Sequence, residues 1–286
     1  MMKKLLKKIL KPIGNKIIHW GHRWLDENRQ STLMKQADER SLYRTVAGDL
    51  FWLEKGLYID DCIIHEGMFE YASTQIAHRL VKSGDIVVDV GANIGYYSVI
   101  FSRLVGPKGH VFSFEPTQYF GRVLKQNLDA NSIKNVNVIP LGLSDAPAEM
   151  KIQIDGCSAT LHVPGGGELL SQESISLTTL DGFVKKHQIP RIDFIKIDVD
   201  GHEPAVLNGG WQTIDRDKPL ILMEISHAHY LQSGITAWDF YKMLKEKDLY
   251  IYDEDTMEEF KDLNRFLYKC GNFTHSANIV LSYRRI

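Results

Sequence analysis

From about residue 84 onward, short runs of β-branched and apolar residues alternate with amphipathic stretches. This alternation is typical of a parallel sheet with helices on both faces, because strands buried on two sides read as continuous apolar runs. The expected strands are Ile86–Val90, His110–Phe114, Val136–Pro140, Phe194–Ile197, Leu220–Ile225, Leu249–Tyr252 and Asn278–Ser282. Helices are predicted between most of them, for instance over Thr117–Ala130 and Ala237–Lys247. The fold class is therefore α/β.

A less regular segment, Ala146–Ser176, interrupts the alternation between the third and fourth expected strands. It contains Pro164 followed by three glycines, and residues 150–154 alternate in polarity. Such a segment predicts a loop or a small hairpin, and loops at this edge of an α/β sheet border substrate sites.

Composition and charge narrow the class of protein. With 286 residues and 44% hydrophobic content, the chain can bury one sizeable core plus an appendage. The 34 basic and 36 acidic residues leave a net charge of −2, so we expect no nucleic-acid partner. The acidic stretch Asp253–Glu259 predicts a solvated loop.

The chain carries neither the cysteine pattern nor the apolar runs of a secreted or membrane-spanning protein. Cys62, Cys157 and Cys270 are far apart and form no CxxC pair, which fits neither a disulfide framework nor a zinc finger. No apolar run reaches the roughly 18 residues of a membrane-spanning helix. The expected location is the cytoplasm.

Residues 1–20 predict a basic amphipathic helix. Leucines and isoleucines recur at helical spacing, and five lysines occupy the other side. Two interpretations stay open: peripheral contact with anionic lipid at the inner membrane surface, or packing on the chain's own domain or on a second copy in a homo-oligomer. We therefore expect an N-terminal helical extension over residues 1–64 and a catalytic domain over residues 65–286.

The segment from Gly84 to Ser98 has the pattern of a buried strand, a glycine turn and the first turn of a helix. Such a turn lies at the carboxyl end of the sheet, where open α/β folds bind ligands. A dinucleotide-binding turn would need glycine at 91, 93 and 96, but Asn93 and Tyr96 stand at two of these positions. The NAD(P) interpretation is weakened, and no Gly-Lys-Ser/Thr follows to make a P-loop.

Two carboxylates flank this turn. Glu115 ends the next strand, about 25 residues beyond the first glycine, where an acidic residue accepts hydrogen bonds from ribose hydroxyls. Asp89 ends the first strand, and a carboxylate there suits a cofactor that carries an ammonium and a sulfonium. The alternative for Asp89 is that it caps the amides of the turn.

Four segments together resemble the FkbM family of methyltransferases. They are Val88–Ser98, Phe114-Glu115-Pro116, Leu143-Ser144-Asp145 and Ile195–Glu203 with its Lys-x-Asp-x-acid-Gly-x-Glu spacing. The resemblance covers residues 65–285 and implies a class I, Rossmann-like methyltransferase fold. That fold is a doubly wound sheet of about seven strands with the last one antiparallel, and S-adenosylmethionine is the methyl donor.

The resemblance also assigns residues to the cofactor. Asp89, Gly91, Asn93 and Gly95 would surround its methionine part, and Glu115 would hold the ribose. Near the adenine would lie Leu143, Ser144 and Asp145. The chain departs from the commonest family pattern with Asp200 in place of Glu and with His202 in place of a small residue, so the departures fall on the acceptor side.

The acceptor side is expected to form from two strand ends. Asp198 to Glu203 follow one strand, and Glu224, His227 and His229 follow the next, so the two groups can converge beside the cofactor. In an extended chain Asp198, Asp200 and His202 would face one way. His202 is then the candidate general base, oriented by Asp198 or Asp200, with Asp198 also counted among the cofactor residues.

Other side chains at these strand ends have alternative interpretations. Asp198, Asp200 and Glu224 are the candidates for a divalent metal, although no spacing here is diagnostic of one. Glu203 fits the first turn of a helix, where it favours the helix dipole. Lys196 is expected to point away from the site and to pair with a carboxylate.

The resulting hypothesis is O-methylation of a hydroxyl on a sugar, a glycan or another small metabolite, since FkbM-like enzymes are associated with such acceptors. Three alternatives stay open: an N-methyltransferase of a small molecule, an NAD(P)-dependent oxidoreductase, and a non-catalytic scaffold. The expected partner is a small-molecule or glycan acceptor.

Overall fold

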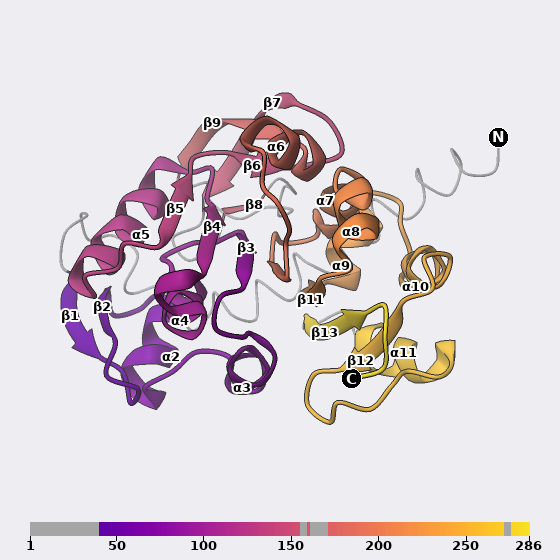
Figure 1. The fold of residues 1–286 in the computed structure, drawn as a ribbon, viewed down its shortest axis with the longest axis horizontal. Helices are drawn as coiled ribbons and strands as arrows, with labels where there is room; N and C mark the ends of the chain where they lie inside the picture. The colour runs from indigo at the N-terminus through magenta and orange to yellow at the C-terminus, as the bar shows by residue number, and fades with distance from the viewer. Residues whose placement is uncertain (1–39, 155–158, 161–170, 272–275) are drawn as a thin grey trace.

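The computed structural model describes residues 40–154, 159–160, 171–271 and 276–286. Its main sheet has seven strands in the order β12-β13-β11-β10-β3-β4-β5 (Figure 1). Within that sheet β13 runs antiparallel to both of its neighbours, and the other pairs are parallel. The strands are β3 (Ile86–Val90), β4 (His110–Phe114), β5 (Val136–Ile139), β10 (Phe194–Ile197), β11 (Leu220–Ile225), β12 (Tyr250–Asp253) and β13 (Ala277–Ser282). The predicted sheet is confirmed, and four of its strands have the predicted bounds.

Helices cover both faces of this sheet because alternate side chains of each buried strand point to opposite sides. In β3, Val87 packs into one apolar core and Val88 into another. The Val87 core is covered by α2 (Tyr58–Glu66), α3 (Tyr71–Leu80), α4 (Tyr96–Val105) and α5 (Gln118–Ala130). The Val88 core is covered by α6 (Leu180–His187), α7 (Glu203–Asn208), α8 (Trp211–Asp217), α9 (His227–Gln232), α10 (Ala237–Lys245) and α11 (Leu263–Cys270). A short 3-10 helix, η1 (Gly106–Lys108), follows α4.

The strand order places a binding site at one point of the sheet edge. The chain runs outward from β3 to β4 and β5, and later continues on the other side of β3 with β10 and β11. Strand order therefore reverses between β3 and β10, and open α/β sheets bind ligands beyond the carboxyl ends of the strands at such a point.

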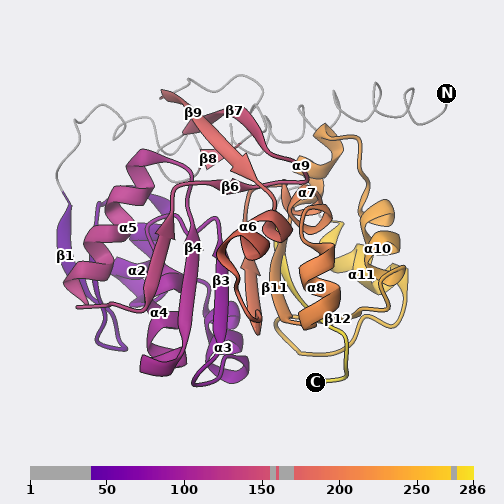
Figure 2. The same cartoon turned by 45° about the horizontal axis from the view of Figure 1, so that its top comes forward.

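The irregular segment forms most of a second, four-stranded sheet that lies across the carboxyl edge of the main sheet (Figure 2). Its strands are β6 (Gly142–Leu143), β7 (Ala148–Ile154), β8 (Ala159–Thr160) and β9 (Ser171–Thr178). The predicted hairpin corresponds to the antiparallel β7–β9 pair. Strands β6 and β8 have two residues each, which is too short to leave a polarity pattern. The predicted Pro-Gly-Gly-Gly loop, residues 164–167, lies outside the described residues.

The described part of the predicted helical extension, residues 40–64, contains a β-hairpin as well as the start of helix α2. Residues 41–53 form a β-hairpin of β1 (Ser41–Arg44) and β2 (Leu50–Leu53). The Trp52 amide donates to the side chain of Asn127 in α5 at 2.7 Å, and Phe51 is fully buried in the Val87 core. The hairpin thus packs on the catalytic domain, and the expected boundary at residue 65 falls inside α2.

The predicted basic helix of residues 1–20 lies outside the described residues. In the part of the chain that the structure does describe, no helix combines the length and the apolar character needed to cross a bilayer.

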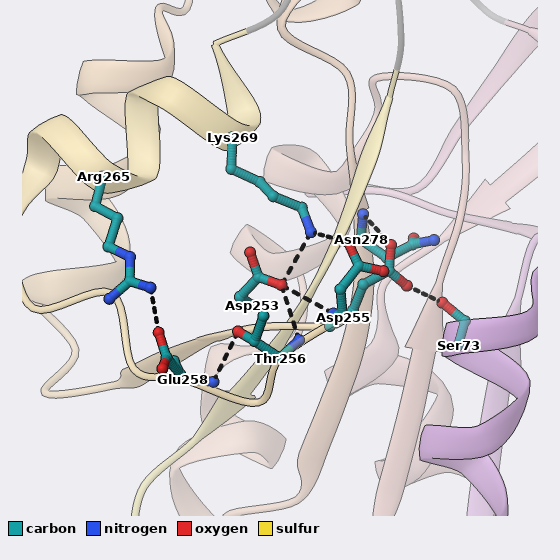
Figure 3. Close-up of polar contacts among 9 residues, drawn as sticks. Ser73, Asp253, Asp255, Thr256, Glu258, Arg265, Lys269 and Asn278 are labelled. Carbon is teal, nitrogen blue, oxygen red and sulfur yellow. Dashed lines mark hydrogen bonds and ion pairs between the residues drawn. The ribbon is translucent and has the colours of Figure 1, made fainter.

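The acidic stretch Asp253–Glu259 contains a solvent-exposed turn, as its composition predicts, and specific contacts hold several of its carboxylates (Figure 3). Lys269 of α11 binds Asp253 at 3.0 Å, and the carboxylate of Asp253 also accepts amide protons of the turn. Glu254 accepts a hydrogen bond from the hydroxyl of Ser73 in α3. The turn therefore joins the C-terminal strands to a helix near the start of the domain.

Candidate active site

The turn after β3 is built from backbone geometry. The amides of Gly91 and Ala92 both donate to the carbonyl oxygen of Phe114 at 3.0 Å. Gly91, Asn93 and Gly95 have φ angles of 78°, 50° and 87°, in the left-handed region that favours glycine. This alternation folds the chain back at the strand end before α4 begins at Tyr96.

Glycine at position 91 is also required by the space around it. A Cβ atom on Gly91 would lie 1.9 Å from the carbonyl oxygen of Asp198, the residue after β10. The turn and the β10 end therefore touch through backbone, which places the predicted cofactor residues and the predicted acceptor residues side by side.

Glu115 braces this turn from the end of β4. Its Oε2 accepts the Asn93 amide at 2.9 Å, and its Oε1 accepts the Thr117 amide at 2.9 Å and the Thr117 hydroxyl at 2.6 Å. Burial raises the pKa of Glu115, although these hydrogen bonds act in the opposite direction. A carboxylate oxygen can accept two hydrogen bonds, so Oε2 has capacity for a ribose hydroxyl in addition to Asn93.

Asp89 is almost completely buried at the end of β3. Its Oδ2 accepts the hydroxyl of Ser98 at 2.6 Å, and Ser98 in turn contacts Ser113 at 2.7 Å. Within the described residues, Oδ1 of Asp89 has no hydrogen-bond partner. Burial raises the pKa of Asp89. The hydrogen bond that the structure shows goes to a side chain of α4 and not to an amide of the turn.

Lys196 is the cation of this group of carboxylates. It is the register partner of Asp89, it is 3% exposed, and its ammonium binds Asp198 at 2.7 Å. Although burial opposes it, the charges of Asp198, Glu70 and Asp89 raise the pKa of Lys196 above its ordinary value. The expected pairing with a carboxylate is found, but the expectation that Lys196 points away from the site is wrong.

Glu224 lies beside Asp198 on the same face of the sheet. Ile197 pairs with Met223, so the next residues of the two parallel strands, Asp198 and Glu224, are neighbours. Within the described residues, Oε2 of Glu224 is buried without a hydrogen-bond partner. Burial, together with the nearby acidic residues, of which Asp198 contributes most, raises the pKa of Glu224 well above its ordinary value.

The loop from Asp198 to Glu203 turns sharply instead of continuing as a strand. Asp200 has a φ of 49° and Gly201 a φ of 97°. The extended chain that would make Asp198, Asp200 and His202 face one way is therefore not found. Glu203, fully buried, accepts the amides of Val199 at 3.0 Å and Gly201 at 3.2 Å. Its carboxylate thus closes this loop, and burial raises the pKa of Glu203 to about 7.

His202 connects two predicted parts of the site. Its Nε2 lies 2.9 Å from the hydroxyl of Ser144, and that hydroxyl donates to Asp145 at 3.2 Å. Burial lowers the pKa of His202, and the charge of Asp145 opposes this shift. Leu143 is buried in β6, directly before this contact. A residue predicted for the adenine side and the candidate base are therefore in contact.

The two histidines after β11 make local contacts, one at the start of α9 and one with the first residue of α10. The amide of Ala237 donates to Nδ1 of His227 at 3.1 Å, and His229 Nδ1 contacts the hydroxyl of Ser226 at 2.6 Å. Burial lowers the pKa of His227. These contacts give both histidines a part in the local structure.

The structure gives no support to the three metal candidates Asp198, Asp200 and Glu224. Among the residues that the structure describes, no group of three or more His, Cys, Asp or Glu side chains is arranged to hold a metal ion.

The sequence does not predict three residues that lie at the candidate site, Glu70, Tyr97 and Asn278. Glu70 precedes α3 and accepts the hydroxyl of Tyr97 at 2.8 Å, and the side chain of Asn278 donates to Glu70 at 3.3 Å. Tyr97 resembles a core aromatic in the sequence, and Asn278 starts an otherwise apolar strand. No local pattern around Glu70 points to the site, because its partners come from distant parts of the chain.

Residues 89–273 match the Methyltransferase FkbM domain. The chain belongs to the FkbM methyltransferase family. It thus carries a methyltransferase domain, and its seven-stranded sheet has the reversed last strand expected for the class I fold. The oxidoreductase and scaffold alternatives are not favoured.

Known proteins resemble this FkbM methyltransferase to different extents. The hexuronic acid methyltransferase AglP of Haloferax volcanii is 30% identical over 172 residues, which are 59% of this chain and 64% of AglP. The match thus spans less than two thirds of AglP. Methyltransferase sdnD of Sordaria araneosa is 23% identical over 61% of this chain and 74% of its own length. The crystal structure of methyltransferase FkbM from Methylobacillus flagellatus KT superposes with a TM-score of 0.45, at 16% identity over 73% of this chain and 50% of that one.

The residues at the switch point of this FkbM methyltransferase fit S-adenosylmethionine. The cofactor carries an ammonium and a sulfonium, and Lys196 is surrounded by the carboxylates of Glu70, Asp89 and Asp198. Acidic charge therefore exceeds basic charge around Lys196, and Asp89 retains a buried oxygen without a partner in the described chain. A buried carboxylate oxygen of this kind is stabilised by a cationic ligand.

Proposed function

We propose that this chain transfers the methyl group of S-adenosylmethionine to a hydroxyl of a sugar, a glycan or a related small metabolite. The observation that carries the proposal is the position of the half-buried imidazole of His202, which contacts the hydroxyl of Ser144. His202 lies on the Asp198–Glu203 loop, and Asp198 of this loop touches the glycine turn at Gly91. An imidazole with a lowered pKa is neutral near pH 7 and can accept a proton from a hydroxyl. The similarity to a hexuronic acid methyltransferase supports a sugar as the acceptor class.

The cofactor would be held by residues from four strand ends. When bound, S-adenosylmethionine supplies a methyl group on a positively charged sulfur. Asp89, Gly91, Asn93 and Gly95 would hold the methionine part. Glu115 would hold the ribose, Leu143, Ser144 and Asp145 would lie on the adenine side, and Asp198 would face the cofactor from β10.

The hydrogen bonds of His202 indicate which nitrogen is basic. Because the Ser144 hydroxyl donates to Asp145, it can accept the Nε2–H of His202, which places the basic nitrogen at Nδ1. With the methyl group supplied by the cofactor, Nδ1 of His202 would take the proton that the acceptor hydroxyl loses when its oxygen is methylated. The carboxylate of Asp145, whose charge acts on His202, would stabilise the imidazolium that forms.

The substitution His202→Ala tests this role. We expect a decrease in kcat of about 10²- to 10⁴-fold, with the dissociation constant of S-adenosylmethionine changed by less than about threefold, because His202 acts on the acceptor. The assay uses uronic acids, nucleotide sugars and short glycans, and calorimetry measures cofactor binding. His229→Ala is the matched control, since His229 contacts Ser226, the residue before α9. An unchanged kcat for His202→Ala, or methylation of amines in place of hydroxyls, would refute the proposal.

Peripheral membrane contact and homo-oligomer formation through residues 1–20 stay predictions, because that segment lies outside the described residues. Liposome sedimentation of the full chain and of a chain starting at Asp26 tests the first. Equal partitioning of the two chains on anionic vesicles would remove it.

A further inference from the structure

Glu70 has an unusual backbone conformation for its residue type. It is the residue before α3, its φ is 44°, and its side chain makes no capping hydrogen bond to that helix. A residue other than glycine in the left-handed region costs about 1–3 kcal/mol and persists where surrounding contacts require it. Glu70 also lies outside the segment that matches the family domain, residues 89–273.

The contacts of Glu70 lead toward the site. One oxygen accepts the hydroxyl of Tyr97, at the start of α4 directly after the glycine turn, at 2.8 Å. The other accepts the side-chain amide of Asn278 at 3.3 Å, and Asn278 is the register partner of Glu224. The carboxylate therefore joins α4 and β13 on the face of the sheet that carries Asp198.

Tyr97 links Glu70 to the central cation. The ammonium of Lys196 lies 4.4 Å from the centre of the Tyr97 ring and binds Asp198 at 2.7 Å. Tyr97 therefore contacts both Glu70 and Lys196. The ammonium is ion-paired with Asp198, and the negative charges of both Asp198 and Glu70 act on it.

We propose that Glu70 is a positioning residue of the active site, which acts through Tyr97 and Lys196 to fix the carboxylate of Asp198 toward the cofactor. The proposal rests on the place given to Asp198 in the proposed function. With Glu70 present, the positive charge of Lys196 is offset by two negative charges and neutralises Asp198 only in part. Without the charge of Glu70, Lys196 would neutralise Asp198 more completely, and the site would attract the cationic cofactor less strongly.

The test is calorimetric titration of the full chain and its variants with S-adenosylmethionine, which needs no acceptor. Glu70→Gln removes the charge and keeps the shape, and Glu70→Gly removes the side chain while suiting the left-handed backbone. We expect both variants to bind the cofactor about tenfold more weakly, the size expected for one charge in a partly buried group.

Ser73→Ala is the matched control on the same helix. It removes the hydrogen bond from α3 to Glu254, which Figure 3 shows, and leaves the contacts of Lys196 intact. We expect its affinity for S-adenosylmethionine to stay within about twofold of the native value.

A double-substitution cycle separates positioning from a general structural effect. In an Asp198→Asn background, Glu70→Gln should weaken binding by less than about twofold, because it acts through Asp198. Native affinity in both Glu70 variants, or full additivity with Asp198→Asn, would overturn the proposal. If the native chain bound no S-adenosylmethionine, the cofactor assignment and this proposal would both fail. If the cofactor binds and no sugar is methylated, the proposed acceptor alone is refuted.

Discussion

The two sides of the site are built in different ways. The cofactor turn is made of backbone: three left-handed residues within five positions, and two amides on the carbonyl of Phe114. The other side is made of side chains from distant segments, such as His202 and Ser144, which are 58 positions apart, and Glu70 and Asn278, which are 208 positions apart. A local pattern can therefore encode the first side, whereas the second exists only after the whole sheet has assembled.

Gly91→Ala should have the largest effect, because it tests whether the cofactor turn depends on its backbone geometry. A Cβ here meets the Asp198 carbonyl in a left-handed residue, so we expect a loss of about 4 kcal/mol in the free energy of unfolding, or no detectable cofactor binding. Gly84→Ala is the control: Gly84 has a φ of 88°, but a Cβ there meets no atom within 4 Å. It should cost about 1 kcal/mol. Equal effects of the two substitutions in urea unfolding would show that the close approach is unimportant.

Glu203 gives a test of the acceptor side, because its titration should make the free energy of unfolding depend on pH. Burial raises its pKa from 4.5 to about 7 in the folded chain. Between pH 4.5 and 7 the unfolded chain releases the proton of Glu203 while the folded chain retains it. The contribution of Glu203 to the free energy of unfolding is therefore complete below pH 4.5 and is lost as the pH rises toward 7. The free energy of unfolding should fall by about 3 kcal/mol. Glu203→Gln should remove this pH-dependent contribution. If the free energy of unfolding of the native chain and of the variant changed equally between pH 5 and 8, the prediction would be contradicted.

Glu115→Gln tests the cofactor side. The substitution keeps the size of the side chain but weakens the hydrogen bonds to Asn93 and to a bound ribose, so we expect S-adenosylmethionine affinity to fall by about 2 kcal/mol. Thr117→Val is the control, because it removes one donor to Glu115 and leaves the carboxylate in place. Calorimetry that shows the same loss for both variants would mean that Glu115 acts only by bracing the turn.

The smallest effect is expected for Ser144→Ala, at the contact between the two sides. Losing the hydrogen bond to His202 should lower kcat by about fivefold, near 1 kcal/mol, because the imidazole is no longer oriented. Affinity for S-adenosylmethionine should change less than kcat. A larger change in affinity than in kcat would assign Ser144 to the cofactor alone.

The same division explains what could be predicted. Strands β3 and β4 agree with their predicted bounds because each is an apolar run next to turn residues. The glycine turn at Gly91 can likewise be identified from the local sequence alone. The direction of Lys196 and the turn at Asp200 were predicted wrongly, because burial of an ion pair and a left-handed residue depend on tertiary contacts. The role of Glu70 leaves no local signal for the same reason.

The position of β13 bears on how the chain folds during synthesis. This strand comes last in the described order but inserts between β11 and β12, which hydrogen-bond to it and not to each other. While the ribosome is still translating residues 277–282, β12 has no partner in the sheet and Asn278 cannot yet reach Glu70. Because a nascent chain folds from its N-terminal part, the cofactor turn can form early, whereas the charged cluster around Lys196 is completed only after the last strand emerges.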